Sequence, residues 1–182
     1  GGGVAIGDVN NDGLEDIYFT SNQESNKLYL NKGNLEFNDI TIQAKISDEI
    51  GWTTGVTMVD INNDGWLDIY VCKSGKPGGE LRHNELFINQ GTDDNGHLQF
   101  VEMAEAYGIA DEGLSAHAAF FDYDKDGDLD MYLVNHRPDF HNTGRLNMRI
   151  EKSFSEFSSD KLYRNDGDFF TEITHKAGVV NK

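Results

Sequence analysis

Three segments of the sequence repeat one acidic pattern, D-x-[DN]-x-D-G-x-x-D. They are DVNNDGLED at residues 8–16, DINNDGWLD at residues 60–68 and DYDKDGDLD at residues 122–130. A motif that recurs every few tens of residues is typical of an array of similar supersecondary units. The chain is therefore predicted to contain three copies of one structural unit, each built around an acidic loop.

Four short runs with β-strand character accompany each loop, one before it and three after it. In chain order they are 4–6, 17–19, 27–31 and 37–41; 56–59, 69–71, 85–89 and 100–104; and 118–121, 131–133, 161–165 and 170–174. Each unit is predicted to be four antiparallel strands, with the acidic loop joining the first strand to the second. A helical period occurs only at 145–157, which predicts one short helix there.

Repeats of four strands at this spacing predict an all-β fold made of β-propeller blades. The expected blades are 1–46, 47–109 and 110–179, the last with an insert at 135–160, and 180–182 would begin the connection to a further blade. Propellers close with about four to eight blades. Three blades therefore predict part of a larger propeller, or a ring that another chain completes.

The acidic loops have the composition of a calcium site. Positions 1, 3, 5 and 9 of the pattern supply side-chain oxygens, position 6 is a glycine that allows a sharp turn, and position 7 offers a backbone carbonyl. The expected ligands are Asp8, Asn10, Asp12, Leu14 and Asp16; Asp60, Asn62, Asp64, Trp66 and Asp68; and Asp122, Asp124, Asp126, Asp128 and Asp130. With water, each set reaches the six to eight oxygens that Ca²⁺ takes. Three Ca²⁺ sites are predicted.

Other interpretations of the loops fit less well. Magnesium demands tighter octahedral geometry, and transition metals favour His or Cys, which the loops lack. An EF-hand requires Glu at loop position 12, where this chain has Phe19, Val71 and Leu133. Asp, Asn and Gly also form ordinary turns, but three identical patterns in one context favour a cation. Because only the third loop has aspartate at position 3, we expect it to bind most tightly.

The overall charge excludes several partners. The chain has 32 acidic and 15 basic residues and a formal net charge of −17. Such a surface repels nucleic acid and anionic membranes, and no apolar stretch has the length for direct membrane insertion. Cys72 lies in an apolar run, so it is interpreted as a small strand residue.

The loops and their flanks resemble FG-GAP/VCBS repeats, as in integrin α-subunit propellers, and the bacterial ASPIC/UnbV-associated, cartilage acidic protein-like subgroup. The segments that carry the resemblance, besides the loops, are 120–122, 130–132, 135–137, 165–174 and 177–179. The resemblance implies a seven- or eight-bladed propeller with Ca²⁺ in its loops, in a longer exported or surface-anchored protein. It implies little about the ligand, because such propellers serve several functions.

A ligand site is expected in the insert at 135–160, where basic and aromatic residues gather in an otherwise acidic chain. The candidates are His136, Arg137, Phe140, His141 and Arg145. Arg and His could hydrogen-bond a sugar or a carboxylate while Phe140 stacks on it; alternatively, the insert only packs against a neighbouring blade or chain. Trp52, expected in a connection between blades, and Trp66, at position 7 of the second loop, are candidate sugar platforms, but packing between blades explains them at least as well.

The function predicted from these features is a calcium-stabilised extracellular binding module for a glycan or protein at the bacterial cell surface. Calcium is abundant outside the cell, so an extracellular, outer-membrane-anchored or periplasmic location is expected. The alternatives are a non-catalytic scaffold subunit, or a glycan-active hydrolase or lyase with His136 or His141 as general base and Asp139 orienting it. No nucleophile motif supports an enzyme, and none is predicted.

Overall fold

The computed structural model describes residues 2–47, 51–75, 82–136, 157–167 and 169–180. Within these residues, three four-stranded antiparallel sheets follow one another along the chain. Sheet 1 contains β1 (Val4–Gly7), β2 (Asp16–Phe19), β3 (Lys27–Asn31) and β4 (Phe37–Asp39). Sheet 2 contains β5 (Trp52–Val59), β6 (Asp68–Ser74), β7 (Glu85–Thr92) and β8 (Leu98–Glu102). Sheet 3 contains β9 (Ser115–Phe121), β10 (Asp130–Asn135), β11 (Lys161–Asn165) and β12 (Phe170–Glu172), and the short helix α2 (Thr174–Ala177) follows it.

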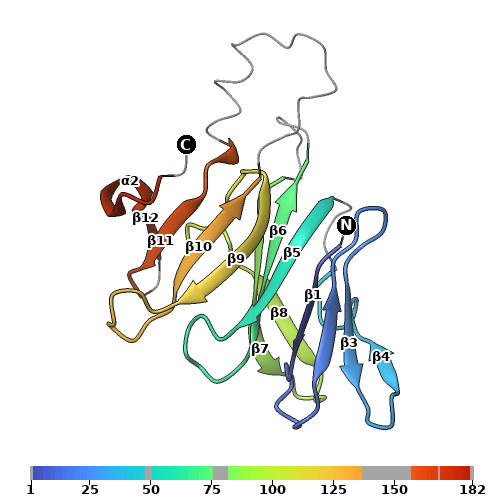
Figure 1. The fold of residues 1–182 in the computed structure, drawn as a ribbon. Coiled ribbons are helices and arrows are strands. Elements are labelled where there is room, and N and C mark those ends of the chain that lie inside the picture. The colour runs from blue at the N-terminus through green and yellow to red at the C-terminus, as the bar shows by residue number, and fades with distance from the viewer. Residues whose placement is uncertain (1, 48–50, 76–81, 137–156, 168, 181–182) are drawn as a thin grey trace, which may run out of the picture.

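Each sheet is a simple meander in which every strand pairs with the next one in sequence. The acidic loops join β1 to β2, β5 to β6 and β9 to β10, as the sequence predicts. Figure 1 shows these three loops at the lower ends of the sheets, and the connections that follow β2, β6 and β10 start at the opposite ends. The first strands β1, β5 and β9 lie next to one another.

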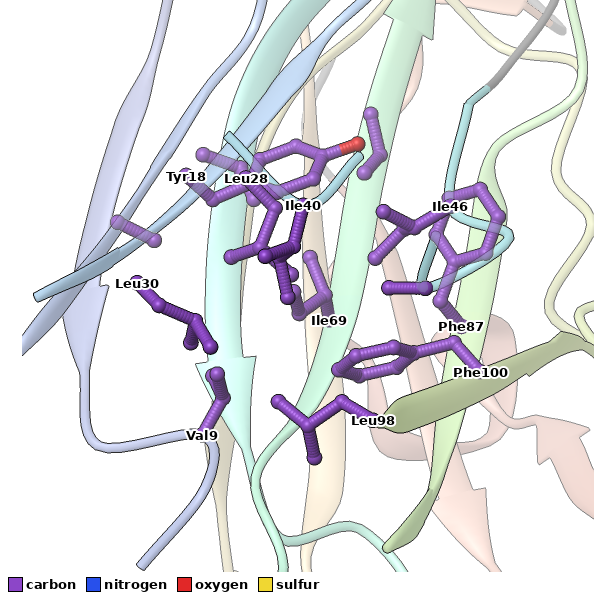
Figure 2. Packing of buried hydrophobic residues seen from close by; sticks show 14 residues of the cluster. Val9, Tyr18, Leu28, Leu30, Ile40, Ile46, Ile69, Phe87, Leu98 and Phe100 are labelled. Atoms are coloured by element: carbon purple, nitrogen blue, oxygen red, sulfur yellow. The ribbon is translucent and has the colours of Figure 1, made fainter. Parts of the chain in front are cut away.

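Sheet 2 is buried on both faces because sheets 1 and 3 pack on either side of it. Successive strand residues point to opposite faces, so Ile69 and Val71 of β6 join a core with sheet 1, while Tyr70 and Cys72 join a core with sheet 3. Figure 2 shows the first core, in which Tyr18 and Leu28 of sheet 1 lie across from Ile69 and Phe87. Every residue of β6 is buried as a result.

The first strands of neighbouring sheets approach closely, and this approach depends on glycine. A Cβ atom placed on Gly3 would lie 2.5 Å from the carbonyl oxygen of Thr54, and one on Gly55 would collide with the carbonyl oxygen of Ala116. Threonine hydroxyls tie the same strands together: Thr54 Oγ1 donates to the Ser115 carbonyl at 2.6 Å, and Thr57 Oγ1 donates to the Ala118 carbonyl at 2.8 Å. The chain therefore stacks its sheets most tightly along one edge.

The fourth strand of each sheet ends earlier than expected. The strands were predicted to reach residues 41, 104 and 174, but they end at Asp39, Glu102 and Glu172. Side-chain acceptors turn the chain at these points: Asp39 Oδ1 accepts the N–H of Thr41 at 3.0 Å, and Glu102 Oε1 accepts the N–H of Ala104 at 2.9 Å. The turns that follow carry buried residues such as Ile46 and Ile109, which close the two cores.

The prediction that Trp52 lies in a connection between blades is wrong. Trp52 is the first residue of β5, which starts four residues before the predicted run, and it pairs with Ser74. A bulge between Thr53 and Val56 lets the strand continue past Gly55. The expected helix at 145–157 lies outside the described residues except for Phe157.

The architecture is all-β, and three stacked four-stranded antiparallel sheets are consistent with propeller blades. Cys72 is buried in the core between sheets 2 and 3, which confirms its interpretation as a strand residue, and burial strongly raises the pKa of its thiol. Among the described residues, no helix has the length and apolar character needed to span a membrane.

Substitution of Gly55 by alanine should destabilise the packing of sheet 2 on sheet 3. The new methyl group would overlap the Ala116 carbonyl, so we expect a loss of about 1–3 kcal/mol in the free energy of unfolding measured by urea denaturation. The matched control is His117→Ala, because His117 occupies the same position of the third repeat and is exposed. A change there of less than about 0.5 kcal/mol is expected; equal losses at both positions would contradict the close-approach argument.

Candidate metal-binding loops

Each acidic loop turns sharply at the same two positions. The residues at position 4, Asn11, Asn63 and Lys125, have φ of 57°, 57° and 64°, and the glycines at position 6 have φ of 86°, 87° and 100°. These are left-handed conformations, which glycine adopts without steric cost. The sequence repeat is therefore also a repeat of backbone conformation.

The carboxylates at positions 1 and 5 organise the interior of the first two loops. In the first loop, Asp8 accepts the N–H groups of Asp12 at 3.1 Å and Gly13 at 2.7 Å, and Asp12 accepts the N–H of Leu14 at 2.9 Å. In the second loop, the equivalent bonds of Asp60 and Asp64 are 3.0, 2.8 and 2.8 Å long. The side-chain oxygens therefore turn toward the backbone of their own loop, as a cation site requires.

The position-9 aspartates Asp16, Asp68 and Asp130 are completely buried. Each accepts one N–H from position 2 of its loop and one from an asparagine, the fifth residue of the third strand. For Asp16 these donors are Val9 at 3.0 Å and Asn31 at 2.8 Å. The corresponding distances are 3.0 and 2.8 Å at Asp68, and 2.9 and 2.9 Å at Asp130. One carboxylate thus joins the loop to the third strand in every repeat.

Burial raises the pKa of all three position-9 carboxyl groups above their ordinary value of 3.8. For Asp68 the pKa rises to about 7, although the hydrogen bonds from Asn89 and Ile61 oppose the shift. The neighbouring carboxylates Asp64 and Asp60 raise the pKa further. A bound cation would counter both burial and repulsion, so the donor set fits a cation that prefers oxygen ligands.

The third loop brings the most carboxylates together. Asp122, Asp124 and Asp130 each place one carboxylate oxygen within 4.8 Å of the others. In the first two loops position 3 is an asparagine, whose Nδ2 donates to the position-5 aspartate, at 2.9 Å for Asn10 and 2.8 Å for Asn62. Asp124 cannot donate in this way when it is ionised. The third loop therefore carries more uncompensated negative charge.

The position-7 residues Leu14, Trp66 and Asp128 are held against the position-5 carboxylates. Their N–H groups donate to Asp12, Asp64 and Asp126 at 2.9, 2.8 and 3.0 Å. Trp66 also packs against the core between sheets 1 and 2, and its ring lies next to Gly91. The structure thus confirms the interpretation of Trp66 as a packing residue.

A second repeated element was not predicted as part of the site: the asparagine that is the fifth residue of each third strand. Asn31, Asn89 and Asn165 donate their N–H to the position-9 aspartate, and their Nδ2 groups donate to the carbonyls of Glu15, Leu67 and Leu129. Their Oδ1 atoms accept the N–H of the glycine two residues later. The signal was present as Asn-x-Gly after each third run. These residues position the site and do not belong to the ligand set.

Of the expected ligand-site residues in the insert, only His136 is described. It is exposed, and its N–H donates to the Leu114 carbonyl at 2.9 Å. Arg137, Phe140, His141 and Arg145, together with Asp139, lie outside the described residues. At the end of the insert, the ring of Phe157 lies 4.4 Å from the guanidinium carbon of Arg82, which comes from the connection between β6 and β7. The connections of sheets 2 and 3 therefore contact each other.

The three sheets define an all-β protein whose architecture is consistent with propeller blades, and comparison with known proteins agrees with this description. Residues 8–71, which contain the first two acidic loops, match the family described as FG-GAP-like repeat. The chain is similar to cartilage acidic protein 1 of Xenopus tropicalis, with 29% identity over 136 residues, and of Mus musculus, with 25% identity over 135 residues. Each match covers 74% of this chain and 20% of the relative, so the chain spans about a fifth of the length of these curated relatives.

The raised pKa of Asp68 predicts an unusual pH dependence when divalent metal is removed. A folded-state pKa above the unfolded value contributes stability that is full below about pH 4 and is lost as pH rises through about 7. In chelator, the free energy of unfolding measured with urea should therefore decrease between pH 5.5 and 8. In saturating calcium the cation replaces the proton, so the decrease should vanish or reverse. The same slope in both conditions would contradict the assignment.

Proposed function

We propose that the chain is part of a calcium-stabilised β-propeller that acts outside the cell as a binding module for a glycan or protein at the cell surface. The observation that carries the proposal is the threefold repetition of one loop. Each loop has acidic side chains at the same positions, a left-handed glycine at position 6 and a buried carboxylate at position 9. A role as a turn alone would not require a charged group at a fully buried position.

Electrostatics supports a cation in each loop. The carboxylates of Asp122, Asp124 and Asp130 converge within 4.8 Å, and like charges at that separation repel strongly unless a cation lies between them. All the donors are oxygens, which suits Ca²⁺. Calcium modules outside the cell bind with Kd of about 10⁻⁴ to 10⁻³ M, so a calcium-rich environment, extracellular, at the cell surface or in the periplasm, fits these loops.

The exposed apolar residues on the outer face of sheet 1 are evidence for a further blade that covers them. Val4, Ile6 and Phe19 are about half exposed on that face. At the same repeat positions of sheet 2, Val56, Met58 and Val71 pack against sheet 1. By this equivalence, another sheet covers Val4, Ile6 and Phe19 in the complete propeller, either from the same longer chain or from another chain. The resemblance to the bacterial ASPIC/UnbV-associated subgroup favours a single longer chain with seven or eight blades.

We place ligand recognition at the sheet ends opposite the calcium loops. The connections there differ between repeats, whereas the loops are nearly identical, and variable loops on a rigid scaffold are where recognition usually lies. Arg82 and Phe157 join two of these connections, and His136 is exposed beside them. The alternative is a scaffold without a ligand, in which these connections only pack on neighbouring blades. We propose no enzymatic activity.

The calcium proposal predicts both selectivity and an order of affinity. Isothermal titration should show binding of Ca²⁺ and at least about tenfold weaker binding of Mg²⁺. The substitutions Asp8→Ala, Asp60→Ala and Asp122→Ala should each remove one site, and the Asp122 variant should lose the tightest one. Asp128→Ala is the control, because position 7 would contribute only its backbone carbonyl. Loss of the tightest site in the Asp8 variant would contradict the order, and absence of calcium binding would contradict the function.

The binding-module proposal predicts that the chain binds a carbohydrate or a protein when calcium is present. A glycan array probed with and without chelator should show calcium-dependent binding, because the loops hold the sheets that carry the recognition connections. His136→Ala should weaken such binding without changing the calcium affinity. A folded chain that binds no glycan and captures no surface protein would favour the scaffold instead.

A further inference from the structure

We propose that the first two acidic loops bind their cations cooperatively through Asn89, whereas the third loop binds independently. This inference rests on the proposed function of the loops, and it adds a coupling between sites that the repeat pattern does not predict. Asn89 acts as a positioning residue that connects two metal-binding loops and contributes a ligand to neither.

A continuous chain of hydrogen bonds links the buried carboxylates of the first two loops. Asp16 of the first loop accepts the N–H of Val9 at 3.0 Å, and the carbonyl of Val9 accepts Nδ2 of Asn89 at 2.8 Å. The backbone N–H of Asn89 then donates to Asp68 of the second loop at 2.8 Å. Asp16, Val9 and Asp68 are fully buried, and Asn89 is 1% exposed. Water does not compete for these bonds, so a shift at one end is transmitted to the other.

A second, exposed contact joins the same two loops. Nδ2 of Asn11, at position 4 of the first loop, donates to the carbonyl of Gly65, at position 6 of the second loop, at 3.1 Å. Both residues lie in the left-handed turns that shape the loops. The first loop therefore contacts the second at its tip as well as at its base.

The second and third loops lack an equivalent connection within the described parts of the chain. Asn165 occupies the position of Asn89, but its Nδ2 donates only to Leu129 of its own repeat, at 3.2 Å. Asn63 occupies the position of Asn11, and in the part of the chain that the structure describes it makes no hydrogen bond to the third loop. The hydrogen bonds of the asparagine within its own repeat therefore recur, whereas the bonds between neighbouring repeats differ. This difference between the two pairs of loops makes the inference testable.

Cooperativity follows because both sites depend on the same set of hydrogen bonds. When the first cation orders these bonds, the second cation no longer has to order them. A cation in the first loop fixes Asp16 and, through the hydrogen bond from the Val9 N–H, the position of the Val9 backbone and its carbonyl. Asn89 is then held in the orientation in which its N–H donates to Asp68, so part of the ordering needed by the second site has already occurred. Linkage requires the effect to be reciprocal, and typical couplings change affinity by about fivefold or more.

Trp66 provides a direct readout of the second site, because it lies at position 7 of that loop. The experiment uses a variant with Trp52→Phe, because the chain has two tryptophans, Trp52 and Trp66, and this substitution leaves Trp66 as the single fluorophore. Calcium titrations followed by its fluorescence give the Kd of the second site. Disabling the first loop with Asp8→Ala should raise this Kd about fivefold or more, and disabling the third with Asp122→Ala should change it by less than about twofold. Equal effects of the two substitutions would overturn the proposal.

Asn89→Ala then tests the route of coupling. Alanine retains the backbone N–H that donates to Asp68 and removes the side chain that reaches Val9, so adding Asp8→Ala to this background should no longer alter the Kd of the second site. Asn165→Ala is the matched control and should leave the coupling intact. A coupling that survives in Asn89→Ala would exclude the proposed route. If Asn89→Ala does not fold, as judged by circular dichroism, the comparison of Asp8→Ala with Asp122→Ala still decides between coupled and independent sites.

The experiments distinguish a failure of the proposed coupling from a failure of the proposed calcium binding. If the chain with its native loops binds no calcium by isothermal titration, the metal assignment itself fails. If it binds calcium and Asp8→Ala leaves the Kd at Trp66 unchanged, the assignment stands and only the coupling fails.

Discussion

One interaction recurs at the base of every repeat: a fully buried aspartate accepts N–H groups from two segments at once. Asp16, Asp68 and Asp130 each join the start of the acidic loop to an asparagine of the third strand. This contact fixes where the loop begins and how the third strand lies beside it. It also places a carboxyl group where burial disfavours its charge, so that either a proton or a cation must compensate. We propose a cation as that partner at neutral pH, because the loop supplies further oxygens that could bind it.

The hydrogen bonds of these three aspartates are held in place by the packing of the three sheets. Sheet 2 has no solvent-facing side, because its two faces form cores with sheets 1 and 3. Gly3, just before β1, and Gly55 in β5 allow the first strands to approach closely. Since Asn89 belongs to sheet 2 and contacts Val9 of the first repeat, packing between sheets also brings the first two loops together. The packing of the sheets therefore also sets the relative position of the two loops that we propose as metal sites.

The amino-acid pattern predicted the strands, their antiparallel order and the positions of the acidic loops, because strand alternation and turn chemistry are local. It did not predict features that depend on which segments meet in space. Asn89 resembles Asn31 and Asn165 in sequence, yet only Asn89 reaches the loop of another repeat. Trp52 was misplaced because the bulge at Gly55 interrupts the alternation. The contact of Arg82 with Phe157 joins two connections that are far apart in sequence. Neither the ligand nor the location follows from local patterns.

The central claim is that three cations complete this fold, one for each buried aspartate. The most direct test is the stoichiometry of calcium binding to the 182-residue chain, measured by equilibrium dialysis or by native mass spectrometry. The account predicts three calcium ions per chain at about 10 mM free calcium, which is well above the expected Kd of about 10⁻⁴ to 10⁻³ M. A chain that is folded and binds none, or fewer than three, would contradict it, because at least one buried carboxylate would then be compensated in another way.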